Sequence, residues 1–98
     1  MENINCFKPG EDFFNRLATL PLFCFGRVGM DLYPRPIGVS TEDAEYFVSD
    51  MGGSAGNIAV AFARQGGKAS LISAISDDQV GRFVLAQCRR YGVDTTYC

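Results

Sequence analysis

Four residues between positions 31 and 57 have types and a spacing that suit the binding of a polar small molecule. Gly52 and Gly53 are adjacent and directly precede the run SAGNIAVAFAR. A loop without side chains lets a ligand touch the backbone, and the first N–H groups of a following helix are unpaired and partly positive. Asn57 adds donors and an acceptor, and Asp31 adds a carboxylate that only accepts. Hydroxyl groups or a carboxylate would suit such a set.

The same residues also have a purely structural interpretation. Gly52 and Gly53 would then serve a tight turn, Asn57 would cap the helix locally, and Asp31 would be a surface acid. Because glycine turns before helices are common in α/β proteins, spacing alone favours this interpretation. A decision between the two needs the surrounding elements and a wider sequence pattern.

The elements that must position these residues alternate between strands and helices. The short apolar run over residues 20–26 predicts a strand that is buried on both faces. Prolines exclude a helix over residues 27–38, which are predicted to be extended or turns. Residues 44–50 predict a second strand. Residues 54 to about 65 predict a helix that is apolar on nearly every side, so it is expected to pack on several sides.

The rest of the chain continues this alternation. Residues 68–75 predict a buried strand, and Asp77 or Asp78 is expected to cap a helix that runs to about residue 91. Residues 1–18 are interpreted as an accessory segment with a short amphipathic helix. The order predicts an α/β fold with a largely parallel sheet. Ligands of such sheets bind outside the carboxyl ends of the strands, where Asp31 is expected to stand.

Composition and charge exclude several classes of function. The chain has 98 residues, of which 47% are hydrophobic and 20% charged, so it is one folded domain at most. The apolar share is high for so short a chain and predicts surface that contacts a partner subunit or the rest of a longer polypeptide. The net charge of −2 gives no general attraction to phosphate backbones, so no nucleic-acid partner is expected.

The cysteines and the N-terminus favour a cytoplasmic location. The four cysteines form no CxxC pair and the chain has no histidine, so free thiols and no metal site are expected. The first residues lack the features of a signal peptide, and no apolar run approaches about 18 residues. No membrane segment is therefore expected.

The glycine loop does not match the two common phosphate-binding motifs. It lacks the GK[ST] ending of a P-loop, and GGSAGN does not fit GxGxxG. The run GRVG at 26–29 is followed by prolines where a dinucleotide-binding helix would begin. A Rossmann-like domain that binds NAD or ATP directly is therefore disfavoured.

Three longer runs occur in a characteristic order after position 51. These are GGSAGNIAVAFARQGG, ASLISAISDDQVG and YGVDTTY. Their order resembles the N-terminal signature region of the ribokinase family, the PfkB-type carbohydrate kinases, and the resemblance covers residues 22–98. The opening GRVGMDLYP is more specifically similar to the 5-dehydro-2-deoxygluconate kinases of myo-inositol breakdown. Ser76 stands where the family pattern usually has glycine, and we interpret it as a tolerated variation because serine suits most turns.

The resemblance implies a ribokinase-like α/β fold in which the glycine loop belongs to a sugar site. It implies that Asp31 binds hydroxyls of the acceptor sugar, that Gly53 and Asn57 line the same site, and that Gly52 shapes the loop. It also implies that residues from about 32 to 49 belong to a small β lid. Such a lid closes over the sugar, excludes water and often forms a homodimer contact.

The resemblance also implies an activity that these residues cannot complete. It implies an ATP-dependent sugar or sugar-acid kinase that uses Mg²⁺, with 5-dehydro-2-deoxygluconate as the expected acceptor. The family's catalytic base is an aspartate of a C-terminal GAGD-type motif, which these 98 residues lack. No catalytic residue, ATP site or metal site is therefore expected, and residues 1–98 are interpreted as an N-terminal fragment, inactive alone, that holds the acceptor side. A stand-alone sugar-binding or regulatory module is the alternative.

Overall fold

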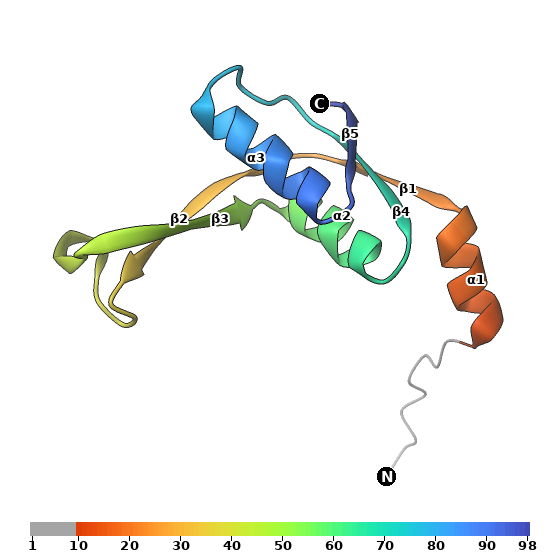
Figure 1. Cartoon of the computed structure of the whole chain (residues 1–98), viewed down its shortest axis with the longest axis horizontal. Coiled ribbons are helices and arrows are strands. Elements are labelled where there is room, and N and C mark those ends of the chain that lie inside the picture. The colour runs from red at the N-terminus through yellow and green to blue at the C-terminus, as the bar shows by residue number, and fades with distance from the viewer. Residues whose placement is uncertain (1–9) are drawn as a thin grey trace, which may run out of the picture.

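The structure is a computed structural model that describes residues 10–98. It has an α/β architecture with a parallel sheet, an antiparallel ribbon and three helices in the described range (Figure 1). In chain order the elements are α1 (Glu11–Thr19), β1 (Pro21–Phe25), β2 (Gly29–Arg35), the 3-10 helix η1 (Thr41–Asp43), β3 (Tyr46–Gly52), α2 (Ser54–Arg64), β4 (Lys68–Ile72), α3 (Gln79–Arg90) and β5 (Asp94–Tyr97).

The parallel sheet has the strand order β1-β4-β5, and α2 and α3 lie over one of its faces (Figure 1). Alternate side chains of β1 and β4 point to this face, because successive residues of a strand face opposite ways. Cys24 and Leu71 are buried there, together with Ala59 of α2 and Cys88 of α3. The predicted α/β fold with a largely parallel sheet is confirmed.

The opposite face of the sheet is open among the described residues. Phe23 and Phe25 alternate with buried Cys24, and their side chains are 54% and 84% exposed. The ring of Tyr97 on β5 lies 6.3 Å from that of Phe23 and is also exposed. The prediction that residues 20–26 are buried on both faces is therefore wrong for this chain, because no described element covers these rings.

Helix α2 has almost the predicted bounds but packs on one side only. Its backbone turns at Gly66, where a φ of 92° suits glycine, and the chain then enters β4. Ala55 and Ala59 are buried against the sheet, whereas Ile58 is 57% exposed. The expectation that α2 packs on several sides is wrong for the described residues, since the outer side of the helix faces no other element.

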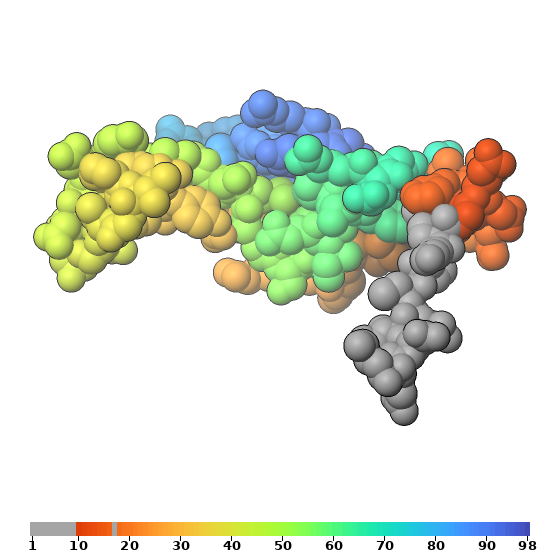
Figure 2. Space-filling model, turned by 90° about the horizontal axis from the view of Figure 1, so that it is seen from below, coloured from red at the N-terminus to blue at the C-terminus, as the bar shows by residue number. Residues whose placement is uncertain are grey.

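A strand occupies much of the segment that was predicted to be extended or turns. β2 pairs with β3 in an antiparallel ribbon, from Gly29 opposite Gly52 to Arg35 opposite Tyr46. A two-stranded ribbon leaves one edge of each strand free, so a proline can be accommodated without breaking a wider ladder. The ribbon projects from the body of the molecule and extends to the left, in yellow and green, in Figure 2. β5 was not predicted at all.

Asp78 is the residue that caps the N-terminus of α3. The Asp78 carboxylate Oδ1 accepts a hydrogen bond from the Gly81 N–H at 2.8 Å and one from the Ser76 hydroxyl at 2.7 Å. These two bonds, the one from Gly81 foremost, hold the pKa of Asp78 below its ordinary value. Ser76, the departure from the family pattern, therefore contributes a donor to the cap.

Among residues 10–98, no helix combines the length and the apolar character that crossing a membrane requires. In the same part of the chain Cys24, Cys88 and Cys98 are free, and the first two are buried. Cys6 and the first half of the accessory N-terminal segment, residues 1–9, lie outside the described residues. The short helix predicted in that segment is present as α1.

Replacement of the α3 cap tests this local structure. Asp78→Ala should lower the melting temperature because the Gly81 N–H loses its partner, whereas Asp77→Ala should have little effect. Asp77 makes only an exposed 3.9 Å ion pair with Arg82. The folded state lowers the pKa of Asp78, so its contribution is complete above the unfolded pKa and is lost as pH falls through the folded pKa.

The two variants should be compared by thermal unfolding over a pH series. The difference between the parent chain and Asp78→Ala should be constant above about pH 5 and shrink progressively below it. Equal losses for the two aspartate variants would show that Asp78 is not the effective cap.

Candidate functional site

The β2–β3 ribbon places Asp31 against Gly52. Gly29 is opposite Gly52 and Asp31 is opposite Asp50, so Asp31 and Gly52 share one face of the ribbon. A Cβ atom at residue 52 would collide with the whole carboxylate group of Asp31. Gly52 is buried, and the space left by its missing side chain is the space that the Asp31 carboxylate occupies.

Gly53 has a different structural reason to be glycine. Its φ is 94° and its ψ is 143°, a conformation that residues with a side chain rarely adopt. A Cβ there would lie 2.5 Å from the carbonyl oxygen of Arg27 and 2.9 Å from Cα of Val28. Gly53 therefore allows the β1–β2 connection to cross the start of α2, and the turn interpretation is confirmed for this residue.

Asn57 lies in the first turn of α2, and its amide side chain is available. Its N–H bonds the Gly53 carbonyl at 3.0 Å as the first helical hydrogen bond. The helix has no side-chain cap, and the Asn57 amide makes no hydrogen bond with any residue in the described part of the chain. The local-cap interpretation of Asn57 is wrong, because the exposed amide bonds nothing.

A tyrosine and a second carboxylate accompany Asp31. The Tyr33 hydroxyl donates to Asp31 Oδ2 at 3.4 Å, and Asp50 Oδ1 accepts the N–H of Met51 at 2.7 Å. The negative charge of Asp31, more than burial, the hydrogen bond or the charge of Asp50, raises the pKa of Tyr33 above its ordinary value. Within residues 10–98 neither acid forms an ion pair. The face therefore presents carboxylates that still need hydrogen-bond donors.

Sequence reasoning missed Tyr33 and Asp50. The segment DLYP does contain the signal, because residues two apart in a strand share a face. Pro34 and Pro36 argued against a strand here, so the pairing of Asp31 with Asp50 was not predicted either. No hydrogen bond joins Asp31 to Asn57, which lie on two sides of the Gly52–Gly53 turn.

The carboxyl ends of β1 and β4 carry a hollow, as expected for an open parallel sheet. Asp31 is not part of the lining of this hollow, and its place in a ligand crevice stays a prediction. β2 carries Asp31 past the strand ends and onto the ribbon. A second hollow follows β1 to the start of α2. The first is lined by Phe25, Gly26, Arg27, Ile72, Ser73 and Ala74. The second is lined by residues 22–27 together with Ser54, Ala55 and Ile58.

The described residues contain no cluster of potential metal ligands, and one of their helix starts is already capped. Nowhere in residues 10–98 do three His, Cys, Asp or Glu side chains gather as metal ligands would. The start of α3 is occupied by its own Asp78 cap. The Asp31 carboxylate can accept hydrogen bonds from hydroxyl groups, and the Asn57 amide can both donate hydrogen bonds to them and accept hydrogen bonds from them.

Comparison with known proteins assigns the chain to a family. The profile of the pfkB family carbohydrate kinases matches residues 20–98, and the chain belongs to that family. It is 40% identical over 81 residues to the 5-dehydro-2-deoxygluconokinase of Clostridium tetani, which covers 83% of this chain and 24% of the relative.

Solved structures give the same result for the fold. The PfkB protein from Polaromonas sp. JS666 superposes with a TM-score of 0.72 and 33% identity, over 81% of this chain and 26% of that one. The Xylella fastidiosa fructokinase with bound ATP gives a TM-score of 0.67 and 29% identity, over 78% and 24% of the two chains. The chain thus spans about a quarter of the length of these relatives, and its fold is ribokinase-like.

Two glycine variants separate backbone strain from steric collision. Gly53→Ala should be more destabilising than Gly38→Ala. Both glycines have a positive φ, of 94° and 93°, but a Cβ at Gly38 meets nothing within 4 Å. Strain alone should cost about 1–3 kcal/mol at Gly38, and Gly53→Ala should exceed it because the added methyl meets Arg27. Urea unfolding of both variants measures this, and equal losses would contradict the described crossing.

Proposed function

We propose that this chain forms the acceptor side of an ATP-dependent sugar or sugar-acid kinase, with 5-dehydro-2-deoxygluconate of myo-inositol degradation as the acceptor. The observation that carries this is the Asp31 carboxylate seated on Gly52, next to the start of a helix whose Asn57 amide is unpaired. A carboxylate that accepts hydrogen bonds and an amide that both donates and accepts them suit the hydroxyls of a sugar.

The electrostatics of the ribbon support a ligand rich in hydroxyls. Asp31 and Asp50 are directly opposite each other, and like charges in that relation destabilise a strand pair. Donors from a bound ligand would relieve this cost, and a polyol offers several. The name of the Clostridium tetani relative favours 5-dehydro-2-deoxygluconate, and the fructokinase makes fructose the first rival.

In this proposal, the chain's own residues bind, orient and enclose the acceptor. Asp31 and Asn57 hold its hydroxyls. Residues from about 32 to 49 of the β2–β3 ribbon form the lid, which excludes water as a competing acceptor. ATP and Mg²⁺, when bound, supply the phosphoryl group and neutralise its charge. The GAGD-type motif that would supply the base does not occur in these 98 residues, so we propose that residues 1–98 are inactive alone.

A homodimer contact through the ribbon belongs to the same proposal. Leu32 and Phe47 lie on the face of the ribbon that is opposite to Asp31, and their side chains are 55% and 44% exposed. The open sheet face with Phe23 and Phe25 favours a kinase part over the alternative of a stand-alone module, because a stand-alone module would cover those rings. The cytoplasmic location stays a prediction.

The acceptor is tested with the complete kinase that contains these residues. Its kcat/KM should be highest for 5-dehydro-2-deoxygluconate among a panel that includes 2-keto-3-deoxygluconate, fructose and ribose. If fructose or ribose leads by tenfold, about 1.4 kcal/mol in the transition state, the proposed acceptor is wrong. Residues 1–98 alone should transfer no phosphate, and turnover that disappears in Asp31→Ala would overturn the proposal that they are inactive alone.

Asn57→Ala tests the sugar site itself. In the complete kinase it should cost about 1–3 kcal/mol of acceptor binding or transition-state stabilisation, with the KM for ATP unchanged. The melting temperature should also stay unchanged, because the amide makes no hydrogen bond within the described chain. Gln65→Ala is the matched control, since it removes an exposed amide from the other end of α2. Acceptor kinetics equal to those of the control would remove Asn57 from the proposed site.

A further inference from the structure

We infer that Tyr33 is a positioning residue for acceptor binding, which acts by holding one oxygen of the Asp31 carboxylate. This inference rests on the proposed function, in which Asp31 binds the acceptor. Tyr33 and Asp31 are two residues apart on β2 and share a face of the ribbon. The Tyr33 hydroxyl lies 3.4 Å from Asp31 Oδ2 and donates to it.

The hydrogen bond from Tyr33 gives the two oxygens of the Asp31 carboxylate different roles. Gly52 bounds the carboxylate on one side, and Tyr33 engages Oδ2. Oδ1 has no partner in the described part of the chain, so it is the oxygen that remains for an acceptor hydroxyl. Without the tyrosine donor the carboxylate could turn about its terminal torsion, which is broad for aspartate.

A donor at this position offsets part of the like-charge repulsion across the ribbon. Asp50 stands directly opposite Asp31, and no cation pairs with either acid within residues 10–98. In the same range, the Tyr33 hydroxyl is the one side-chain donor to either carboxylate. The charges of Asp31 and Asp50 also keep this hydroxyl protonated, because they raise the pKa of Tyr33. The donor is therefore present throughout the neutral range.

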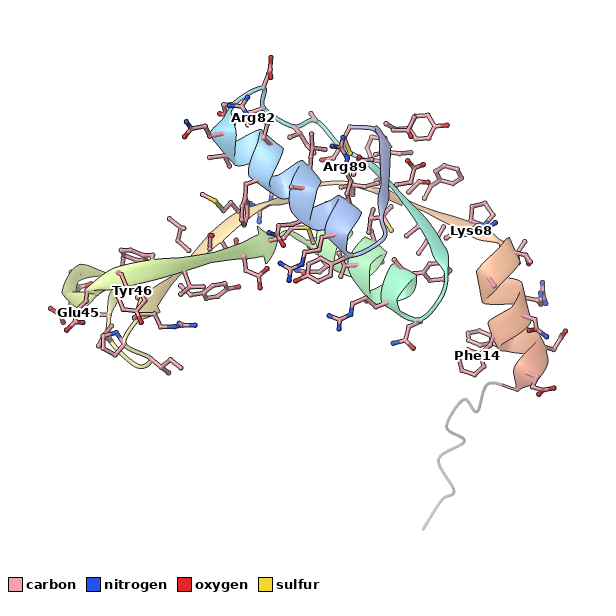
Figure 3. The ribbon with its side chains drawn as sticks, viewed as in Figure 1. Phe14, Glu45, Tyr46, Lys68, Arg82 and Arg89 are labelled. Atoms are coloured by element: carbon pink, nitrogen blue, oxygen red, sulfur yellow. The ribbon has the colours of Figure 1, made fainter. Side chains whose placement is uncertain are left out.

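The exposure of Tyr33 agrees with a role at the acceptor site rather than in the hydrophobic core. Its side chain is 45% exposed and lies outside the hydrophobic core. Tyr46, on the partner strand, provides a matched control: its side chain is 58% exposed, and its hydroxyl has no hydrogen bond among the described residues. It lies at the outer end of the ribbon, far from α2 (Figure 3).

The experiment is a double-mutant cycle in the complete kinase with its best acceptor. Tyr33→Phe should raise the acceptor KM roughly 3- to 10-fold, the scale of one lost hydrogen bond, with the KM for ATP unchanged. Tyr46→Phe should leave both constants unchanged. In an Asp31→Asn background, Tyr33→Phe should have no further effect, because residues that act through one contact are not additive. KM is independent of the folded fraction, so a modest loss of stability does not obscure the result.

The outcomes separate the inference from the function on which it rests. The proposed function is contradicted if the complete kinase phosphorylates no sugar. It is also contradicted if Asp31→Asn leaves the acceptor KM unchanged. If Asp31→Asn is effective while Tyr33→Phe matches Tyr46→Phe, the inference is wrong and the function stands. The inference would also be overturned if the KM increases caused by Tyr33→Phe and Asp31→Asn multiplied fully in the double variant, since Tyr33 would then act independently of Asp31.

Discussion

The rest of the site depends on the close approach of the Asp31 carboxylate to the backbone of Gly52. That approach is possible only because residue 52 has no side chain, and it fixes where a charged group stands on the ribbon. The next residue, Gly53, fits against the Arg27 carbonyl and begins α2. Two adjacent glycines therefore connect the ribbon, the β1–β2 connection and the helix in one turn.

Packing inside the molecule supports this turn from the opposite side. Met51, the residue before the glycines, is buried, and the Cys88 thiol of α3 donates to its sulfur at 3.3 Å. Gly56 of α2 also lies close, since a Cβ there would be 2.6 Å from Cγ2 of Val28. The ribbon is thus anchored to the core at its inner end, while its outer end is free of the helices (Figure 3). A ribbon held in this way suits the proposed lid, because its anchored end can stay in place while the tip moves.

Local sequence signals predicted the elements that local physics determines. The start of α2, its glycine end and an aspartate cap for α3 all depend on nearby backbone groups, although only the structure decided between Asp77 and Asp78. The ribbon was harder because Pro34 and Pro36 argue against regular structure when the number of neighbouring strands is unknown. The exposure of Phe23 and Phe25 could not be predicted, because an apolar strand does not reveal which layers cover it. Residue types and spacing singled out Asp31, Gly53 and Asn57, and the resemblance assigned them to a sugar site, whereas Tyr33 needed the strand to be recognised first.

The most direct measurement of the central claim is the acceptor kcat/KM of the complete kinase with Gly52→Ala, compared with Gly29→Ala. The two glycines are opposite each other in the ribbon, and neither has a positive φ, but only a Cβ at Gly52 meets Asp31. Both variants should fold, because the Asp31 side chain can move aside. The account predicts at least about a tenfold loss for Gly52→Ala, or 1.4 kcal/mol, with ATP kinetics retained and Gly29→Ala unaffected. Full acceptor activity in a folded Gly52→Ala kinase would contradict it.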